Sequence, residues 1–234
     1  MSESQPYNVF GYGSLIFKPP PHVIAQVPGF LKGYVRRFAQ KSHDHRGTPE
    51  VGSNLLQIGK QTQLDPTTFR QNPGRVVTLV HKEDWDLFSG SDAFPDDDIV
   101  WGITYTIDPA HAAEVREYLD YREKASHIVD GYTMEVIDVW GVVDGKEKVI
   151  VPGCYVGRND NPSFLGSEPL DLLARRIWES VGPSGRNKDY LFQLATAVHQ
   201  LSPDSRDSHL FALEAKVRQL DAAARNTNHT NIPH

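Results

Sequence analysis

Two segments of the sequence carry residue types that suit chemistry on a small polar substrate. The first is FGYGSL at residues 10–15, where Gly11 and Gly13 flank a tyrosine and a serine follows. Glycines let the main chain approach a ligand closely, so this stretch could present backbone N–H groups to an anion or a carbonyl oxygen. The alternative is a turn or β-bulge that needs a positive φ at one of the two glycines. The pattern alone favours neither interpretation.

The second segment is the end of a predicted helix over residues 108–124 (DPAHAAEVREYLDYREK). The apolar positions of this helix include Leu119, and a step of four residues extends their row to Glu123. A partly buried carboxylate there would have a raised pKa and could act as a base near neutral pH. The alternative is a surface glutamate in the last turn, paired with Arg122 or Lys124.

Other reactive residue types give weaker signals. His43 and His45 flank Asp44, but no third ligand is evident nearby, and a loop that lines a pocket is the preferred interpretation. Cys154 lies in an apolar strand and has no identifiable base partner, which favours a small buried side chain over a nucleophile. The G-x-G after the first strand is not a dinucleotide fingerprint, because Ile16 replaces the third glycine and prolines follow. We therefore predict no metal site and no nucleotide site.

The composition limits the possible partners and compartments. The formal net charge is −6 and there is no Lys/Arg run, so we expect neither nucleic acid nor a membrane surface as a partner. A single cysteine excludes an intramolecular disulfide and fits a reducing compartment. The N-terminal residues do not resemble a signal peptide. We expect a cytoplasmic protein, with the nucleus as a second compartment, that is a monomer or a weak homodimer.

The strands and helices that must position these residues can be predicted from the sequence, and together they indicate an α+β fold in a single domain, 1–234. Apolar, β-branched runs predict strands over 7–16, 75–80, 99–107, 132–143 and 148–157, the last two joined by a hairpin at DGKE. Helical spacing of apolar residues predicts helices over 169–181, 188–201 and 207–224. Segments 50–72 and 86–98 are expected to be loops, and 226–234 a disordered tail. Strands first and helices mostly last indicate α+β rather than alternating α/β.

The motifs occur together in an order that resembles one family. The chain is similar to the ChaC-like γ-glutamylcyclotransferases, in particular their glutathione-specific branch. The similarity covers nearly the whole chain, and its most specific parts are FGYGSL, YLDYRE and GPSGRN. The matching segments are VFGYGSLIFKP (9–19), GYVRRF (33–38), DHRGTP (44–49), NPGRVVTLV (72–80), WGITY (101–105), YLDYREK (118–124), GYT (131–133), YVGRNDNPSFLG (155–166) and GPSGRNKDYLFQL (182–194).

The resemblance implies a fold and an activity. It implies a compact β-barrel with flanking helices, and cleavage of glutathione to 5-oxoproline and cysteinylglycine without a metal or organic cofactor. It also implies that Glu123 is the catalytic acid/base and that the FGYGSL loop holds the γ-glutamyl group. From their charge, Arg46 and Arg75 are candidates for the substrate carboxylates. The expected substrate-binding residues are thus Val9, Phe10, Gly11, Tyr12, Gly13, Ser14, Leu15, Arg46 and Arg75.

Two segments depart from the family pattern. Residues 51–71 form an insertion between DHRGTP and NPGRVV, and 125–130 lengthen the link between YREK and GYT. Both lie close in sequence to expected site elements, so the reaction type is better supported than the substrate. The alternatives are a cyclotransferase for other γ-glutamyl amines or amino acids, and a γ-glutamyl-binding protein without activity. A binding protein would not need the glutamate of YLDYRE.

Overall fold

A seven-stranded sheet forms the centre of the computed structural model, which describes residues 7–42, 73–94, 99–124, 132–143, 146–182, 184–202 and 205–229. Its strand order places the N-terminal strand third, between strands from later in the chain. In sheet order the strands are β6 (Tyr132–Val136), β9 (Gly153–Gly157), β1 (Tyr7–Gly11), β5 (Ile99–Ile107), β2 (Val23–Lys32), β7 (Val139–Val143) and β8 (Lys146–Ile150).

The four other strands that the structure describes form two small sheets of two strands each. After β2 the chain turns at Gly33, whose φ of 78° favours glycine, and continues as β3 (Tyr34–Ser42). This strand pairs with β4 (Gly74–His81). A short hairpin of β10 (Val181–Gly182) and β11 (Gly185–Arg186) precedes the helix that begins at Asn187.

The expected compact barrel is only partly confirmed. The seven-stranded sheet is curled, but β6 and β8 are its edges and do not pair within the described part of the chain. The physical reason lies at Gly33, where β3 departs to pair with β4 instead of extending the sheet. The architecture is therefore α+β with a half-barrel sheet.

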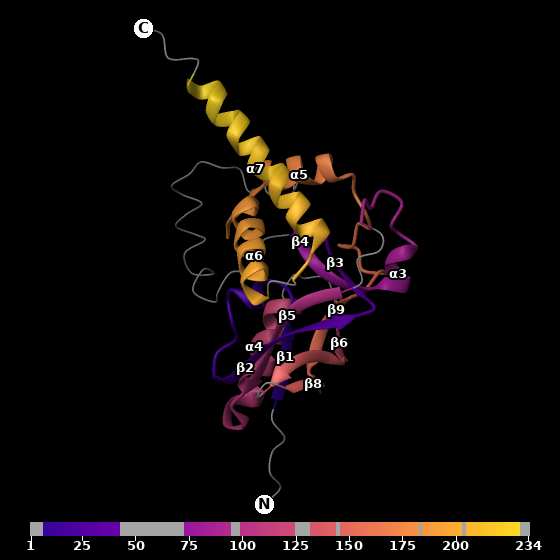
Figure 1. The fold of residues 1–234 in the computed structure, drawn as a ribbon, viewed down its shortest axis with the longest axis vertical. Coiled ribbons are helices and arrows are strands. Elements are labelled where there is room, and N and C mark those ends of the chain that lie inside the picture. The colour runs from indigo at the N-terminus through magenta and orange to yellow at the C-terminus, as the bar shows by residue number, and fades with distance from the viewer. Residues whose placement is uncertain are drawn as a thin grey trace, which may run out of the picture.

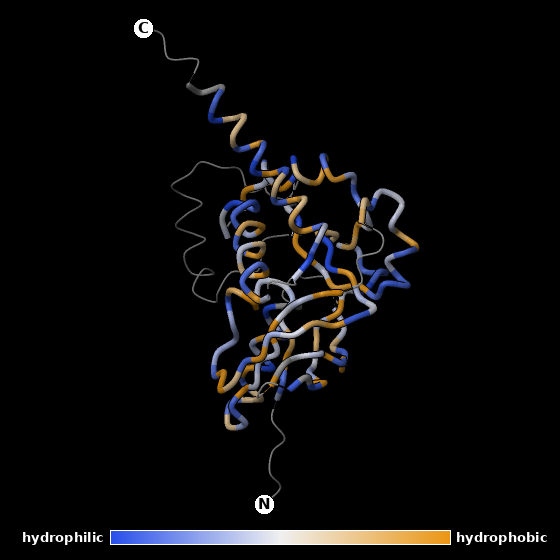
Figure 2. Tube along the Cα trace, in the orientation of Figure 1, coloured by the Kyte–Doolittle hydropathy of each residue, from blue (hydrophilic) through white to orange (hydrophobic). Residues whose placement is uncertain are grey.

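Three C-terminal helices pack on one another at one end of the molecule, and a fourth lies beside the sheet (Figure 1). The distal part of α7 extends away from the body and is hydrophilic over much of its length (Figure 2). The helices are α3 (Lys82–Asp86), α4 (Ala112–Lys124), α5 (Leu170–Glu179), α6 (Asn187–Leu201) and α7 (Ser208–His229), with 3-10 turns η1 (Ser14–Ile16) and η2 (Pro109–His111). No helix of the described ranges is both long and apolar enough to cross a membrane.

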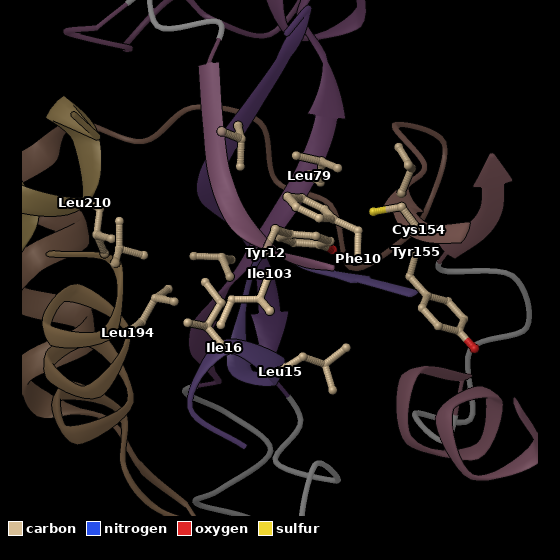
Figure 3. Packing of buried hydrophobic residues seen from close by; sticks show 14 of the residues in the cluster. Phe10, Tyr12, Leu15, Ile16, Leu79, Ile103, Cys154, Tyr155, Leu194 and Leu210 are labelled. Atoms are coloured by element: carbon tan, nitrogen blue, oxygen red, sulfur yellow. The ribbon is translucent and has the colours of Figure 1, made fainter. Parts of the chain in front are cut away.

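One hydrophobic core joins the sheet to these helices. Phe10 and Ile103 from the sheet, Leu119 from α4, Leu194 from α6 and Leu210 from α7 belong to one buried cluster, part of which is drawn in Figure 3. Because burial of each large apolar side chain contributes about 1.5–3 kcal/mol, this shared core fixes α4 and α6 relative to β1.

Most predicted elements are confirmed, with shifted bounds. The first strand ends at Gly11, and residues 14–16 form the 3-10 turn η1 instead of continuing it. The segments 132–143 and 148–157 each break into two strands, and the expected hairpin joins β7 to β8. Helix α7 continues through residues 226–229, the start of the segment expected to be a tail. The strands β2 and β3 and the short helix α3 were not predicted.

Candidate active site

The FGYGSL segment forms a turn at the end of β1, and hydrogen bonds from β3 and β5 hold its main chain. The Nη1 atom of Arg36, on β3, donates to the carbonyl oxygen of Tyr12 at 2.8 Å. The hydroxyl of Tyr105, on β5, donates to the carbonyl oxygen of Leu15 at 2.8 Å. Burial raises the pKa of Tyr105 to about 12, so this phenol keeps its proton and remains a donor.

The two glycines of the turn allow close packing rather than a left-handed backbone. Neither has a positive φ, so the alternative interpretation, a turn that needs a positive φ at Gly11 or Gly13, is wrong. A Cβ on Gly11 would lie 2.7 Å from Cβ of Leu15, because the chain folds back on itself in η1. A Cβ on Gly13 would lie 3.0 Å from Cγ2 of Val77 and 3.7 Å from the Tyr190 hydroxyl. The Gly13 position thus has more room than the Gly11 position.

The side chains of the turn divide into buried and available groups. Four side chains of residues 9–15 are 0–7% exposed and belong to the core: Val9, Phe10, Tyr12 and Leu15. A ligand could therefore contact these residues through their backbone groups. Ser14 is partly exposed. The N–H groups of Ser14 and Leu15 open the 3-10 turn, where such donors have no partner within the turn. They also donate to no acceptor among the residues that the structure describes.

The end of α4 is joined directly to this turn. The Nη2 atom of Arg122 donates to Oγ of Ser14 at 2.6 Å, and Nη1 lies 3.4 Å from the carbonyl oxygen of Lys18. Val115 and Leu119 are fully buried, as the predicted inward row requires. The main chain of Glu123 continues this row in α4, but its side chain is outside the described part of the structure.

A second contact ties the same end of α4 to β9. The hydroxyl of Tyr155 donates to Oδ1 of Asp120 at 2.8 Å, and Figure 3 shows this ring pointing from the sheet towards a helix. Tyr7, on β1, lies nearby with Arg116 stacked on its ring at 4.8 Å. Burial raises the pKa of Tyr7, while the charge of Arg116 opposes the shift. These contacts hold α4 against β1 and β9 through hydrogen-bonding and charged groups.

The structure describes one of the two arginines that were expected to bind substrate carboxylates. Arg75 is 7% exposed, and its Nε and Nη2 donate to the carboxylate of Glu168 at 2.6 and 3.1 Å. Its Nη1 donates to the carbonyl oxygens of Pro73 and Gly74, so a substrate carboxylate would have to share these donors. Arg46 and the histidines at 43 and 45 lie outside the described residues. Cys154 is fully buried, which agrees with a packing role.

Sequence reasoning did not identify Asp120, Tyr155 or the contact between Arg122 and Ser14. All of these residues fall within the motifs YLDYREK, YVGRNDNPSFLG and FGYGSL. The family resemblance carried by these motifs was therefore the sequence signal that could have identified them. A further small pocket, lined in part by Arg37, Asp92 and His209, lies elsewhere between β3 and α5, and its polar groups already interact with one another.

The fold is similar to that of a solved structure from a named class of enzymes. It matches a crystal structure of a yeast γ-glutamyl cyclotransferase specific to glutathione, with a TM-score of 0.68 and 33% sequence identity. The match covers 92% of this chain and 96% of that chain. The fold is thus that of the γ-glutamylcyclotransferases. A family model described as ChaC-like protein matches residues 7–63 and 60–220, and the chain belongs to the ChaC-like family.

Named relatives extend over most of the chain. A Schizosaccharomyces pombe protein named glutathione-specific gamma-glutamylcyclotransferase is 41% identical over 213 residues, which are 90% of this chain and 92% of that protein. A Saccharomyces cerevisiae protein of the same name is 35% identical over 224 residues, and the match covers 82% of this chain and 85% of that protein.

Proposed function

We propose that the protein is a glutathione-specific γ-glutamylcyclotransferase, a carbon–nitrogen lyase that degrades glutathione. The observation that carries this proposal is the hydrogen bond between Arg122 and Ser14, which joins the helix end bearing Glu123 to the glycine turn. The names of the fungal relatives supply the substrate. This contact supports a site in which the helix end bearing Glu123 and the backbone donors of the glycine turn act on one substrate.

The reaction needs no external nucleophile. The α-amine of the γ-glutamyl group attacks its own γ-carbonyl carbon and forms a five-membered lactam, and the amide bond to cysteine breaks. The products are 5-oxoproline and cysteinylglycine, and no water is consumed. A site that holds the chain bent provides the effective molarity of an intramolecular reaction, which is worth up to about 7–11 kcal/mol in favourable cases.

Glu123 would move the proton. An α-amine has a pKa of about 8, so it is mostly protonated at neutral pH and must lose a proton before it attacks. The carboxylate of Glu123 accepts this proton and then returns it to the leaving nitrogen of cysteine. Its place on the buried row of α4, after Leu119, supports a role inside the protein rather than at its surface.

The glycine turn would bind the γ-glutamyl group. The N–H groups of Gly13, Ser14 and Leu15 either stabilise the oxyanion of the tetrahedral intermediate or fix the α-carboxylate. One oxyanion donor is typically worth about 2.7–4 kcal/mol. Arg122 fixes the Ser14 hydroxyl, and Arg36 and Tyr105 fix the carbonyl oxygens on either side, so the donors are held before substrate binds.

The test compares Glu123→Gln with Glu117→Gln, a matched change at an exposed position of the same helix. Each protein is incubated with glutathione, and 5-oxoproline is measured by mass spectrometry. We expect Glu123→Gln to lower kcat by about 10²–10⁴-fold with normal folding, and Glu117→Gln to keep full activity. Comparable turnover in Glu123→Gln and the parent would remove this carboxylate from the mechanism.

A panel of γ-glutamyl compounds tests the substrate separately. Glutathione should give the highest kcat/KM among γ-glutamyl amines, γ-glutamyl amino acids and glutathione itself. A higher kcat/KM for another member would keep the ring closure but change the substrate. Binding of glutathione without any 5-oxoproline would favour a γ-glutamyl-binding protein.

A further inference from the structure

A cluster of metal-ligating side chains lies at the opposite end of α4 from Glu123. It consists of His22, in the turn before β2, with His111 and Glu114 at the start of the helix. One ligand atom from each residue lies within 4.8 Å of those of the other two. Nε2 of His22 is 3.9 Å from Oε1 of Glu114. Sequence analysis did not consider these residues, because His22 is far from the other two in the chain.

The main chain of Asp108 holds both histidines in place. Its N–H donates to the carbonyl oxygen of His22 at 2.9 Å, and its carbonyl oxygen accepts from the N–H of His111 at 2.9 Å. The two imidazole rings consequently stack, with centroids 3.8 Å apart and planes within 3° of parallel. His22 adopts a φ of 57°, which is uncommon for a residue with a side chain and persists where the surroundings enforce it.

The chemistry of the cluster suits a divalent transition metal. Two imidazoles and one carboxylate are a ligand set that zinc sites use, with water in the fourth position. Nδ1 of His111 is buried without a hydrogen-bond partner among the described residues, and the carboxylate of Asp108 lies 3.4 Å away. A small movement would let this carboxylate orient a ligating histidine from the outer shell. Together, Asp108 and Glu114 offer two negative charges against the two positive charges of the ion.

We propose that His22, His111 and Glu114 form a binding site for Zn²⁺ or a similar first-row divalent metal ion. Tetrahedral zinc at about 2.0–2.1 Å from each ligand places two ligand atoms roughly 3.4 Å apart. The observed 3.9 Å between His22 and Glu114 exceeds this by about half an ångström, and the other ligand-atom pairs lie within 4.8 Å. His22 and Glu114 have exposed side chains, which can move to close these distances. The stacked rings tilt from parallel so that both nitrogens point at the ion.

This site takes no part in ring closure. Glu114 and Glu123 are nine positions apart in the helix, which is a distance of about 13.5 Å along its axis. A bound ion instead joins the turn before β2 to the start of α4. Because it binds the folded protein, it raises the melting temperature by mass action. The inference does not depend on the proposed catalytic function.

The test measures zinc binding calorimetrically on untagged, chelator-treated protein. The variants are His22→Asn, since asparagine tolerates a positive φ, and Glu114→Gln. The control is His199→Gln, because His199 lies 3.8 Å from Glu214 in a similar histidine–glutamate pair. We expect one zinc per parent chain, at least about tenfold weaker binding in both site variants, and parent affinity in the control. Thermal melts without metal establish that each variant folds.

Two further readouts separate this site from other zinc-binding groups. Zinc should raise the melting temperature of the parent but not of His22→Asn, and Mg²⁺ should raise neither, because imidazole ligands select transition metals. Co²⁺ bound to the parent should give visible absorption bands that His22→Asn lacks. Equal zinc affinity in the parent and His22→Asn, or no saturable binding by the parent, would overturn the proposal.

Discussion

His209, in the first turn of α7, is an imidazole buried among charged residues of β3 and the start of α7. It is 7% exposed, and its Nε2 accepts from the N–H of Phe38 at 3.4 Å. Burial lowers its pKa from 6.5 to about 4; the charge of Arg37 adds to this effect, and Asp207 and Asp92 oppose it. His209 is therefore neutral in the folded protein at every pH above about 4, and we expect it to make stability depend on pH.

The sign and size of the effect follow from proton linkage. Between pH 6.5 and about 4, the unfolded chain binds a proton at His209 and the folded protein does not, so the free energy of unfolding falls as pH falls. Each full pH unit in this window costs about 1.36 kcal/mol. From about pH 7.5 to about pH 5 the loss is roughly 2 kcal/mol, which lowers the melting temperature by about 4–8 °C in a chain of this size.

The assay is urea unfolding of the parent and of His209→Gln at both pH values, with thermal melts in parallel. Glutamine keeps a polar group near the Nε2 position and does not titrate. Subtracting the two pH dependences removes the contribution of all other groups. We expect the parent to lose roughly 2 kcal/mol more than His209→Gln over this range. Identical pH dependence in the two proteins would refute a neutral, buried His209.

Four further changes probe the site itself. Gly11→Ala should cost about 1–3 kcal/mol of stability, because its Cβ would overlap Leu15, and an unchanged melting temperature would contradict this. Gly13→Ala should lower kcat/KM far more than stability, and the reverse result would make Gly13 a structural glycine. Arg122→Gln should lower kcat by up to about 10²-fold, since it frees the helix end from the turn, whereas parent turnover would argue against that link. EDTA should leave turnover unchanged; loss of activity that one divalent ion restores would show a metal in the reaction.

Local patterns were sufficient to predict the elements that the chain determines locally. A helix was predicted to begin at Asp108, and the carboxylate of this residue accepts from the N–H of Ala110 at 2.9 Å. The turn at DGKE was predicted to close a hairpin, and Val143 pairs with Lys146 across it. In each case the residues that specify the structure are within a few positions of one another, so a single sequence contains the whole signal.

The strands β2 and β3 could not be predicted in this way. Pro28 lies within β2, where a missing N–H argues against a strand, yet β2 is central and pairs with both β5 and β7. In β3, Arg36 and Arg37 suggest an exposed segment, but they are 1% and 2% exposed. Among the residues that the structure describes, their charges are compensated by Asp207 and Asp92, which come from elsewhere in the chain.

The candidate site shows the same division between local and distant information. The motif residues Ser14 and Glu123 stand out by type and spacing, whereas the group that fixes the turn is Arg36, whose Nε donates to Asp207 at 2.7 Å across 171 residues of sequence. Arg36 also bonds the carbonyl oxygens of Tyr12 and Trp101 at 2.8 and 2.9 Å, so one buried cation links the turn, β5 and the start of α7. Removing one partner of such a buried pair leaves an uncompensated charge at a cost of about 3–5 kcal/mol. The backbone donors of the glycine turn therefore depend on a contact with the C-terminal helix that no local pattern in FGYGSL contains.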